Sequence, residues 1–554
     1  MERLIKIRCE NNNSELYVKP GTSLLDLLDI VHIKNKYRFI AAYVNNKSKD
    51  LNYLIYEHLS VKFIDATHFE GARVYHRSLF FVLYKAVYDL YPECVLKIKH
   101  SVARGFYFEV EGLKMTADAP AEIKERMDEI VRQDVPILRD VYYLDEAKEI
   151  YRQSGFNDKL RLLDTRQHLY VTINQMANVY GYFYGTLAPS TGYVDVFDIR
   201  RFYDGFCLCV PKRNNPLELE EVGERDKLFD VFKLHKEWIE ILDVSDIGSL
   251  NTMILRRQTG DLIKIGEAFQ EKMFAQLADI IYEKNGEGVK VILISGPSSS
   301  GKTTFSKRLN IQLRVFGLKP VILSMDNYFV NREDTPLDEK GKHDYESVDA
   351  LDRELFNANL NALIRGEEVE IPKFDFHDGK RYMDGTKLRL SEKSVIIIEG
   401  IHALNPILTS DVPDKNKFKI YVSALTSLSM DHLSRISTTD NRLLRRIVRD
   451  SKYRNHTALQ TLQRWGSVRR GEEKNVFPFQ DEADYMFNSA LFYEISVLKR
   501  YAEPLLLEVP DTAEEYSEAK RLLSMLDFFL PIDDAEIPPT SMIREFIGHS
   551  SFDY

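Results

Sequence analysis

Residues 296–304 are the stretch of this chain with the clearest chemical meaning. The sequence there reads Gly-Pro-Ser-Ser-Ser-Gly-Lys-Thr-Thr, and only Ser295 separates it from the apolar run 291–294. Two glycines at this spacing let the backbone curl so that successive N–H groups point at an anion. The lysine adds a full positive charge, and the threonine hydroxyl next to it can bind Mg²⁺. The stretch therefore predicts a loop that binds nucleotide phosphates.

The elements around this loop agree with the motif Gly-x-x-x-x-Gly-Lys-Thr of a P-loop. The short apolar run predicts a buried parallel strand, and the residues from Phe305 onward predict an amphipathic helix, whose N-terminus favours anions. The alternative interpretation is a flexible serine-rich turn. We predict that eight residues hold the phosphates of ATP: Gly296, Ser298, Ser299, Ser300, Gly301, Lys302, Thr303 and Thr304.

Two acidic residues follow further predicted strands of the same sheet. Asp326 comes shortly after the run 320–323, and Glu399 ends the run 394–398. Ligands of doubly wound sheets bind at the carboxyl ends of the strands, so Asp326 is a candidate general base for an attacking hydroxyl. An aspartate that caps a turn is the alternative. Glu399 matches a Walker B position and, with Thr303, is predicted to hold Mg²⁺.

A row of arginines follows at helical spacing. Four guanidinium groups fall on one face, and the opposite face is apolar. Like charges in a row repel each other, and the neighbouring Asp440 and Asp450 offset only part of this repulsion. The row is either a solvated basic face or, as we expect beside a P-loop, a clamp on the phosphoryl group during transfer. The four residues are Arg442, Arg445, Arg446 and Arg449.

The order of these motifs resembles that of uridine kinases, which group with the phosphoribulokinases. Besides the P-loop, the resemblance rests on Asp344–Asp352, Pro372–Phe376, Glu399-Gly400 and Asp440–Asp450, and it covers about 240 residues. It implies that ATP phosphorylates the 5′-hydroxyl of a nucleoside, with Asp326 and Lys302 as catalytic residues beside the arginine row. The substrate-binding residues that it implies are Asp326, Tyr345, Glu346, Phe374, Phe376 and Arg442.

This sequence differs from the family pattern at two positions, and the role of two aromatic residues stays open. Glu346 stands where the family usually has an aspartate, and Gly379 replaces a histidine that helps to recognise the pyrimidine. A site that lacks one hydrogen-bonding group loses discrimination between acceptors, so the identity of the nucleoside stays open. Phe374 and Phe376 either wall the flat ring of the acceptor or pack in the core.

The composition limits the classes of protein to which this chain can belong. The chain has 554 residues, 44% hydrophobic and 29% charged, with a formal net charge of −10, which argues against wholesale coating of nucleic acid. Four scattered cysteines do not form a disulfide scaffold or a zinc site. No apolar segment reaches about 18 residues and no signal peptide is recognised, so we expect a cytoplasmic protein that does not span a membrane.

The first 225 residues show a second resemblance. Residues 1–65, with Pro-Gly-Thr-Ser-Leu-Leu-Asp-Leu-Leu at a helix entry, resemble the ubiquitin-like β-grasp fold of the TGS domain. Residues 66–225 resemble the editing domain of threonyl-tRNA synthetases. Arg77, Phe81, Phe183 and Leu187 stand where that family has its histidines and cysteine, so the hydrolytic chemistry is predicted to be lost. RNA binding, a regulatory ligand site and a dimer contact are alternative roles for this region.

The whole order of segments resembles TGS-containing uridine or nucleoside kinases. We predict an α/β fold: a β-grasp domain (1–65), an α+β editing-like domain (66–225), a helical linker (226–285), a P-loop kinase domain with a doubly wound parallel sheet (286–535) and a C-terminal tail (536–554) without an assigned function. A nucleoside is the expected acceptor. A sugar-phosphate kinase and a nucleotide-gated RNA-binding protein are the alternatives, and the oligomeric state stays open.

Overall fold

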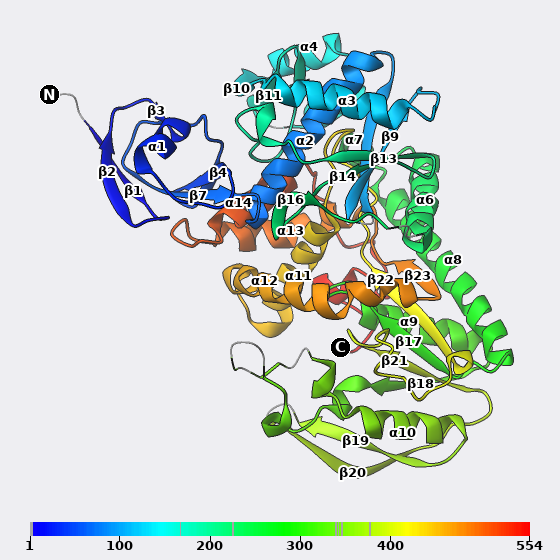
Figure 1. Cartoon of the computed structure of the whole chain (residues 1–554). Coiled ribbons are helices and arrows are strands. Elements are labelled where there is room, and N and C mark those ends of the chain that lie inside the picture. Colours follow the sequence, from blue (N-terminus) through cyan, green and yellow to red (C-terminus); the bar gives the residue numbers. More distant parts are fainter. Residues whose placement is uncertain are drawn as a thin grey trace.

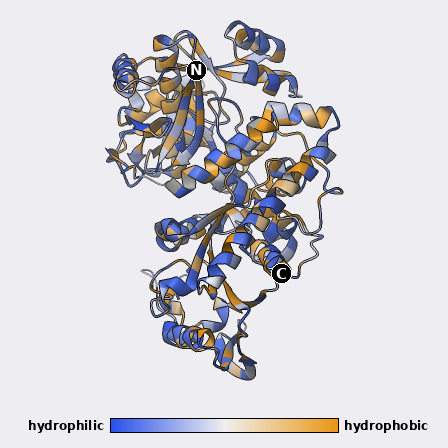
Figure 2. Ribbon diagram, turned by 90° about the vertical axis from the view of Figure 1, so that its right-hand side faces the viewer, coloured by the Kyte–Doolittle hydropathy of each residue, from blue (hydrophilic) through white to orange (hydrophobic). Residues whose placement is uncertain are grey.

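The structure is a computed structural model of the whole chain. It describes residues 4–102, 104–166, 168–223, 226–337, 341, 343–344, 347–375 and 378–554. In Figure 1 the N-terminal half lies above a parallel sheet that belongs to the C-terminal half. Figure 2 shows both halves from the side, with the N-terminus in the upper half and the C-terminus in the lower one. Within the described residues, no helix is long and apolar enough to cross a membrane.

The first unit is a five-stranded sheet with helix α1 (Leu24–Val31) beside it. The strand order is β2-β1-β7-β4-β5, with β1 and β7 parallel. Ser23 and Asp26 form a capping box that starts α1, and Leu24 and Leu27 are buried while Leu25 points outward. The TGS resemblance of this unit stays a prediction. The strands are β1 Ile5–Cys9, β2 Ser14–Val18, β4 Phe39–Val44, β5 Lys47–Lys49 and β7 Leu59–Asp65, and a small pair is β3 Thr22–Ser23 with β6 Leu54–Ile55.

The second unit is organised around helix α2 (Phe69–Leu90). This long helix packs on an antiparallel sheet of order β13-β14-β9-β8, and a smaller antiparallel sheet has the order β10-β11-β12. The strands of the whole second unit are β8 Val95–Val102, β9 Gly105–Glu111, β10 Ile137–Tyr143, β11 Tyr170–Met176, β12 Val179–Gly181, β13 Asp198–Phe202, β14 Gly205–Cys209, β15 Pro211–Lys212 and β16 Asn215–Leu219. Its other helices are α3 Ala119–Arg132, α4 Leu144–Gln153 and α5 Asn157–Asp164.

Three helices connect this unit to the second half, where the sequence predicts a helical linker. They are α6 Asp226–Ile241, α7 Ile247–Leu255 and α8 Thr259–Gly286. Helix α8 is more than a connector, because Phe274, Leu277 and Ile281 pack into the core beneath the parallel sheet.

The C-terminal half contains a five-stranded sheet of order β18-β21-β17-β22-β23, in which every pair is parallel. Helices α8 and α9 (Lys302–Val315) cover one face, and α10 (Arg353–Ile364) covers the other. The prediction of a doubly wound parallel sheet is therefore confirmed for this half. The strands are β17 Val291–Ser295, β18 Lys319–Ser324, β21 Ser394–Glu399, β22 Lys417–Ser423 and β23 Tyr485–Asn488; a separate hairpin is β19 Val369–Asp375 with β20 Lys380–Leu388.

The last helices lie between the two halves (Figure 1). Leu443 and Leu444, on the predicted apolar face of the arginine helix, share one core with Tyr151 and Leu162 of the N-terminal half. The same side chains that place the arginines therefore also join the two halves. The helices are α11 Thr438–Arg454, α12 Ala458–Asn475, α13 Glu494–Leu507, α14 Tyr516–Leu526 and α15 Arg544–Ile547.

Candidate active site

The P-loop connects the fully buried strand β17 to helix α9. A Cβ atom on Gly296 would lie 2.0 Å from the carbonyl oxygen of Val422, so only glycine fits this close approach. Gly301 has a φ of +86°, in the left-handed region that favours glycine. The side-chain oxygens of Ser299 and Ser300 are buried and have no hydrogen-bond partner in the described part of the chain. Unused donors in a curled loop at a helix N-terminus fit phosphate oxygens.

Lys302 is folded back onto the loop in this structure. Its Nζ donates hydrogen bonds to the carbonyl oxygens of Gly296 at 2.9 Å and Pro297 at 3.2 Å. Burial lowers the pKa of this amine, and the nearby carboxylates of Glu399 and Glu545 oppose the shift. The positive charge is thus close to the loop but bound to neutral carbonyl groups, which are weak partners that a phosphate can replace.

Thr303 and Glu399, the two predicted Mg²⁺ ligands, are in contact. The Thr303 hydroxyl donates to the Glu399 carboxylate at 2.7 Å, and Ser306 donates to its other oxygen at 3.1 Å. Burial raises the pKa of Glu399. The described residues contain no cluster of three or more metal-binding side chains. This sparse set of oxygen donors fits Mg²⁺, which usually binds one or two protein groups and completes its shell with phosphate and water oxygens.

Asp326 lies in a short 3-10 turn (Met325–Tyr328) immediately after β18. The register pairs Ser324 of β18 with Glu399 of β21, so Asp326 follows at the same edge of the sheet. Asp326 is exposed to solvent, yet the protein around it desolvates the carboxyl and raises its pKa. The cap of this turn is Ser324, whose hydroxyl accepts from the Asp326 backbone N–H, and no hydrogen bond to the Asp326 carboxylate is recorded among the described residues.

The predicted acceptor residues are only partly within the described chain. Phe374 lies in β19 with its ring 5.6 Å from that of Phe329. Tyr345, Glu346 and Phe376 lie outside the described residues. Gly379 has a φ of +68°, and a Cβ atom there would lie 2.6 Å from Nε of Arg332. The backbone conformation thus explains why this position holds glycine, because a histidine would be strained there.

All four predicted arginines reach toward the P-loop or its surroundings. Arg442 Nε donates to the carbonyl oxygen of Ser298 at 3.0 Å, and Arg445 donates to that of Ser299 at 3.3 Å. Arg446 donates to the Ser298 hydroxyl at 2.6 Å. The side chains of Arg442 and Arg445 are at most 2% exposed, whereas those of Arg446 and Arg449 are 15% and 17% exposed. The two inner arginines therefore support the loop, and the two outer ones remain open to a phosphate.

Each arginine of the row also has a carboxylate partner, and three of these partners were not identified in the sequence analysis. Asp450 pairs with Arg446, as its position suggested, but Asp440 bonds to Arg521 instead of the row. The partners come from helices α12, α13 and α15, which no local pattern connects to α11. The pairs are Arg442 with Glu472, Arg445 with Glu494, and Arg449 with Glu545.

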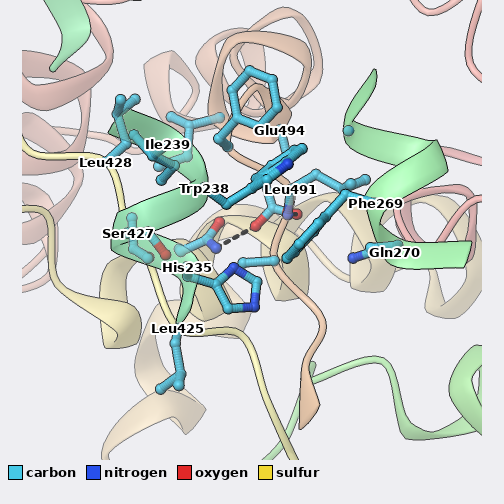
Figure 3. Close-up of a pocket in the computed structure, with 16 residues that line it drawn as sticks. His235, Trp238, Ile239, Phe269, Gln270, Leu425, Ser427, Leu428, Leu491 and Glu494 are labelled. Atoms are coloured by element: carbon cyan, nitrogen blue, oxygen red, sulfur yellow. Dashed lines mark hydrogen bonds between the residues drawn. The ribbon is translucent and has the colours of Figure 1, made fainter. Parts of the chain in front are cut away.

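Glu494 is held in a well-packed environment at the start of α13. It accepts hydrogen bonds from Asn441 as well as Arg445. Figure 3 shows Glu494 in the wall of a small cavity beside Trp238 and Phe269, whose rings stack at 4.0 Å. This cavity has a volume of about 20 Å³. That is room for about one water molecule, so it is not a substrate site.

Two of the carboxylates that pair with the arginine row, Glu472 and Glu545, also accept hydrogen bonds from backbone N–H groups of the P-loop. Glu472 accepts from the Ser298 N–H at 2.8 Å. Glu545 accepts from the Thr304 N–H at 3.3 Å and from its hydroxyl at 2.8 Å, and Tyr554 lies 2.9 Å from the same hydroxyl. The C-terminal tail therefore reaches the P-loop, although nothing in its sequence pointed to this contact.

The N-terminal half has no catalytic arrangement at the positions compared with the editing domain. Arg77 pairs with Glu70 at 2.5 Å and donates to the carbonyl oxygen of Thr186 at 3.0 Å. Phe81 packs edge-to-face on Phe183 at 5.4 Å. These contacts give the four positions a structural role in the core of the second unit.

Comparisons with known proteins match the part of the chain that contains the P-loop. The profile of the Phosphoribulokinase / Uridine kinase family matches residues 291–496. A uridine kinase of Macrococcus caseolyticus is 32% identical over 180 residues, which are 32% of this chain and 78% of that protein. The chain belongs to the phosphoribulokinase/uridine kinase family. A uridine kinase of Staphylococcus epidermidis is 30% identical over 195 residues, 35% of this chain and 84% of that protein.

Solved structures of kinases are also similar to this chain. A structure described as a possible uridine kinase from Bacillus stearothermophilus has 20% identity and a TM-score of 0.24, and the match covers 36% of this chain and 89% of that one. A D-glycerate 3-kinase from Cryptococcus neoformans has 14% identity and a TM-score of 0.20, with 46% and 87% covered.

Proposed function

We propose that this chain is an ATP-dependent kinase that phosphorylates the 5′-hydroxyl of a nucleoside, with uridine or a related nucleoside as the acceptor. Membership of the family supports the coarser statement of a nucleoside or sugar kinase. One observation carries the phosphoryl transfer: Lys302, the Thr303–Glu399 pair and Asp326 gather at the carboxyl ends of β17, β21 and β18. That edge is where doubly wound sheets bind their ligands.

The P-loop residues position the donor. ATP places its phosphates on the backbone N–H groups of the loop, and Lys302 exchanges its two carbonyl partners for phosphate oxygens. Thr303 and Glu399 would hold Mg²⁺, which supplies charge neutralisation of the phosphates when bound. Arg446 and Arg449, the two arginines that remain partly open, lie where they can stabilise the transferring phosphoryl group.

Asp326 activates the acceptor. Its carboxylate accepts the proton of the acceptor hydroxyl while that oxygen forms a bond to the γ-phosphorus, and the bond from γ-phosphorus to the bridging oxygen breaks to release ADP. The raised pKa of Asp326 makes it a stronger base than an ordinary aspartate. No partner of its carboxylate is recorded in the described residues, so the proton site is free for the acceptor.

The test is ATP turnover by the purified chain with Mg²⁺ against nucleosides, sugar phosphates and no acceptor. Stimulation by a nucleoside, lost in Asp326→Asn while ATP still binds, is the expected result. Stimulation by a sugar phosphate alone would replace the nucleoside with the acceptor of the phosphoribulokinase branch. ATP binding without turnover on any acceptor would instead favour the nucleotide-gated alternative, in which the N-terminal half contacts RNA.

A further inference from the structure

A large cleft lies between the two halves of the molecule, and the carboxyl end of β22 forms part of its lining. Its volume is about 800 Å³. The end of β8 and helix α6 form one wall, and β22, α11 and α12 form the other. A smaller cavity of about 120 Å³ between α2 and the start of α11 shares Arg435 with this cleft. The cleft is large enough for a ligand of the size of a nucleotide.

The cleft is basic although the chain as a whole is acidic. Two glutamates, Glu220 and Glu473, line it and both are already paired: Glu220 with Arg104 at 3.3 Å, and Glu473 with Arg469 at 3.4 Å. A third glutamate, Glu472, pairs with Arg442 of the lining, so five arginines face three glutamates and an excess of positive charge remains. The lining arginines are Arg104, Arg213, Arg435, Arg442 and Arg469.

Arg435 supplies much of this excess charge. In the described part of the chain no carboxylate lies within ion-pair distance of its guanidinium, which sits over the ring of Phe106 at 4.9 Å. The nearby Asp440 is occupied by two hydrogen bonds from Arg521, at 2.6 and 2.8 Å. A partly buried cation without a counterion is destabilising, and an anionic ligand would relieve that cost.

Two further polar groups of the same lining lack partners. Nε of Arg469 and the hydroxyl of Thr426 are buried and make no hydrogen bond to any described residue. Unsatisfied buried donors are rare in folded proteins, so each of these two groups is available to water or to a bound molecule. The two terminal nitrogens of Arg469 each have one partner: Nη1 donates to the Thr439 hydroxyl at 2.7 Å, and Nη2 donates to Glu473 at 3.4 Å.

Two flat rings belong to the same lining. His100 stacks on Phe232 at 3.7 Å with an angle of 8° between the planes, and both line the cleft. Arginines bind phosphate by charge-assisted hydrogen bonds, and stacked rings bind bases. We propose that the cleft is a second ligand site that binds a phosphorylated small molecule, with phosphate on Arg435 and Arg469, and that the ring pair favours a nucleotide over other phosphates.

The site is in contact with the P-loop through one residue. Arg442 lines the cleft and also donates to the carbonyl oxygen of Ser298. Its carboxylate partner, Glu472, accepts from the backbone N–H of the same serine. A ligand in the cleft is therefore separated from the nucleotide-binding loop by a single layer of side chains.

Isothermal titration of the full chain with three separate probes, inorganic pyrophosphate, glucose 6-phosphate and GMP, tests the proposal. We expect GMP to bind most tightly, and Arg435→Ala to weaken binding about 10-fold or more, because charge-assisted hydrogen bonds are lost. Lys302→Ala should leave this binding event in place, which separates it from the P-loop. Arg365→Ala, an exposed arginine outside the cleft, is the matched control and should change nothing.

Two outcomes overturn the proposal: no probe binds the wild-type chain, or binding disappears in Lys302→Ala and persists in Arg435→Ala. Equal binding of all three probes would retain the phosphate site and overturn the preference for a nucleotide. If Arg435→Ala does not fold, Asn214→Glu serves instead, because this exposed residue of the rim would add a negative charge and should weaken binding. All these readouts are independent of kinase activity.

Discussion

Replacing Glu545 with glutamine should make ATP bind more tightly. The Glu545 carboxylate accepts from the backbone N–H and the hydroxyl of Thr304 and pairs with Arg449 at 3.3 Å. The Thr304 N–H belongs to the first turn of α9, where it has no partner within the helix and where a P-loop binds phosphate. A nucleotide and this carboxylate therefore compete for the same donors, and ATP must displace the tail contact to bind.

The contacts set the size of the effect. A hydrogen bond to a charged group contributes roughly 1.5–3 kcal/mol net, and a neutral one about 1 kcal/mol. The glutamine keeps an acceptor but loses the charge, so the contact to be displaced weakens by roughly 0.5–2 kcal/mol. At about 1.4 kcal/mol for each factor of ten, the Kd of ATP should fall about 2- to 30-fold. Arg449, released from its carboxylate, should add to the gain.

Isothermal titration with ATP measures the effect directly. Glu536→Gln is the matched control, because Glu536 is an exposed acid of the same tail that contacts Lys264 rather than the P-loop, and its ATP affinity should stay unchanged. Truncation of the tail is a poorer test, since it would remove the buried side chains of Met542, Phe546 and Ile547 and expose the core residues that they cover. An unchanged or weaker ATP affinity in Glu545→Gln would refute the competition and show that the carboxylate holds the loop in its binding conformation.

Three further predictions follow from the site. Asp326→Asn should lower kcat roughly 10²- to 10⁴-fold and leave the Kd of ATP nearly unchanged, and retained turnover would remove Asp326 as the base. The base must be ionised to act, and its pKa is raised. The rate of the wild-type enzyme should therefore begin to fall, as the pH decreases, at a pH above the usual aspartate range. Glu399→Gln should raise the Mg²⁺ concentration for half-maximal rate about 10-fold, measured by titration at fixed ATP; an unchanged Mg²⁺ dependence contradicts its role as a ligand. Arg445→Met should lower the free energy of unfolding in denaturant by about 3–5 kcal/mol, because Glu494 loses its buried cationic partner. Adding Glu494→Leu should restore at least half of the lost stability. No recovery in the double variant would contradict the importance of this ion pair.

Much of the nucleotide side of the site follows from local sequence. The P-loop glycines, Lys302 and the Thr303–Glu399 pair are each specified by a short motif next to a buried strand, and parallel strands bring their carboxyl ends to one edge. Asp326 follows from the same rule. Each of these residues follows the carboxyl end of a strand in the sequence, and the parallel sheet brings these strand ends to one edge.

The arginine row shows where local reasoning ends. Spacing placed four guanidinium groups on one face of α11, but it did not distinguish the buried Arg442 and Arg445 from the more open Arg446 and Arg449. That difference depends on Glu472 and Glu494, which come from other helices. Charge on one helix face predicts that counterions are needed, but not which residues supply them.

By itself, the sequence determined the P-loop, the parallel sheet and the edge of the sheet that holds the candidate site, because each depends on contacts between residues near in the chain or on strand periodicity. Only the tertiary structure decided that Glu545 of the tail sits on the P-loop, and that Arg435 faces a cleft between the halves without a counterion. Those contacts join segments hundreds of residues apart, and their formation depends on how the shared core of α11 packs on the N-terminal half.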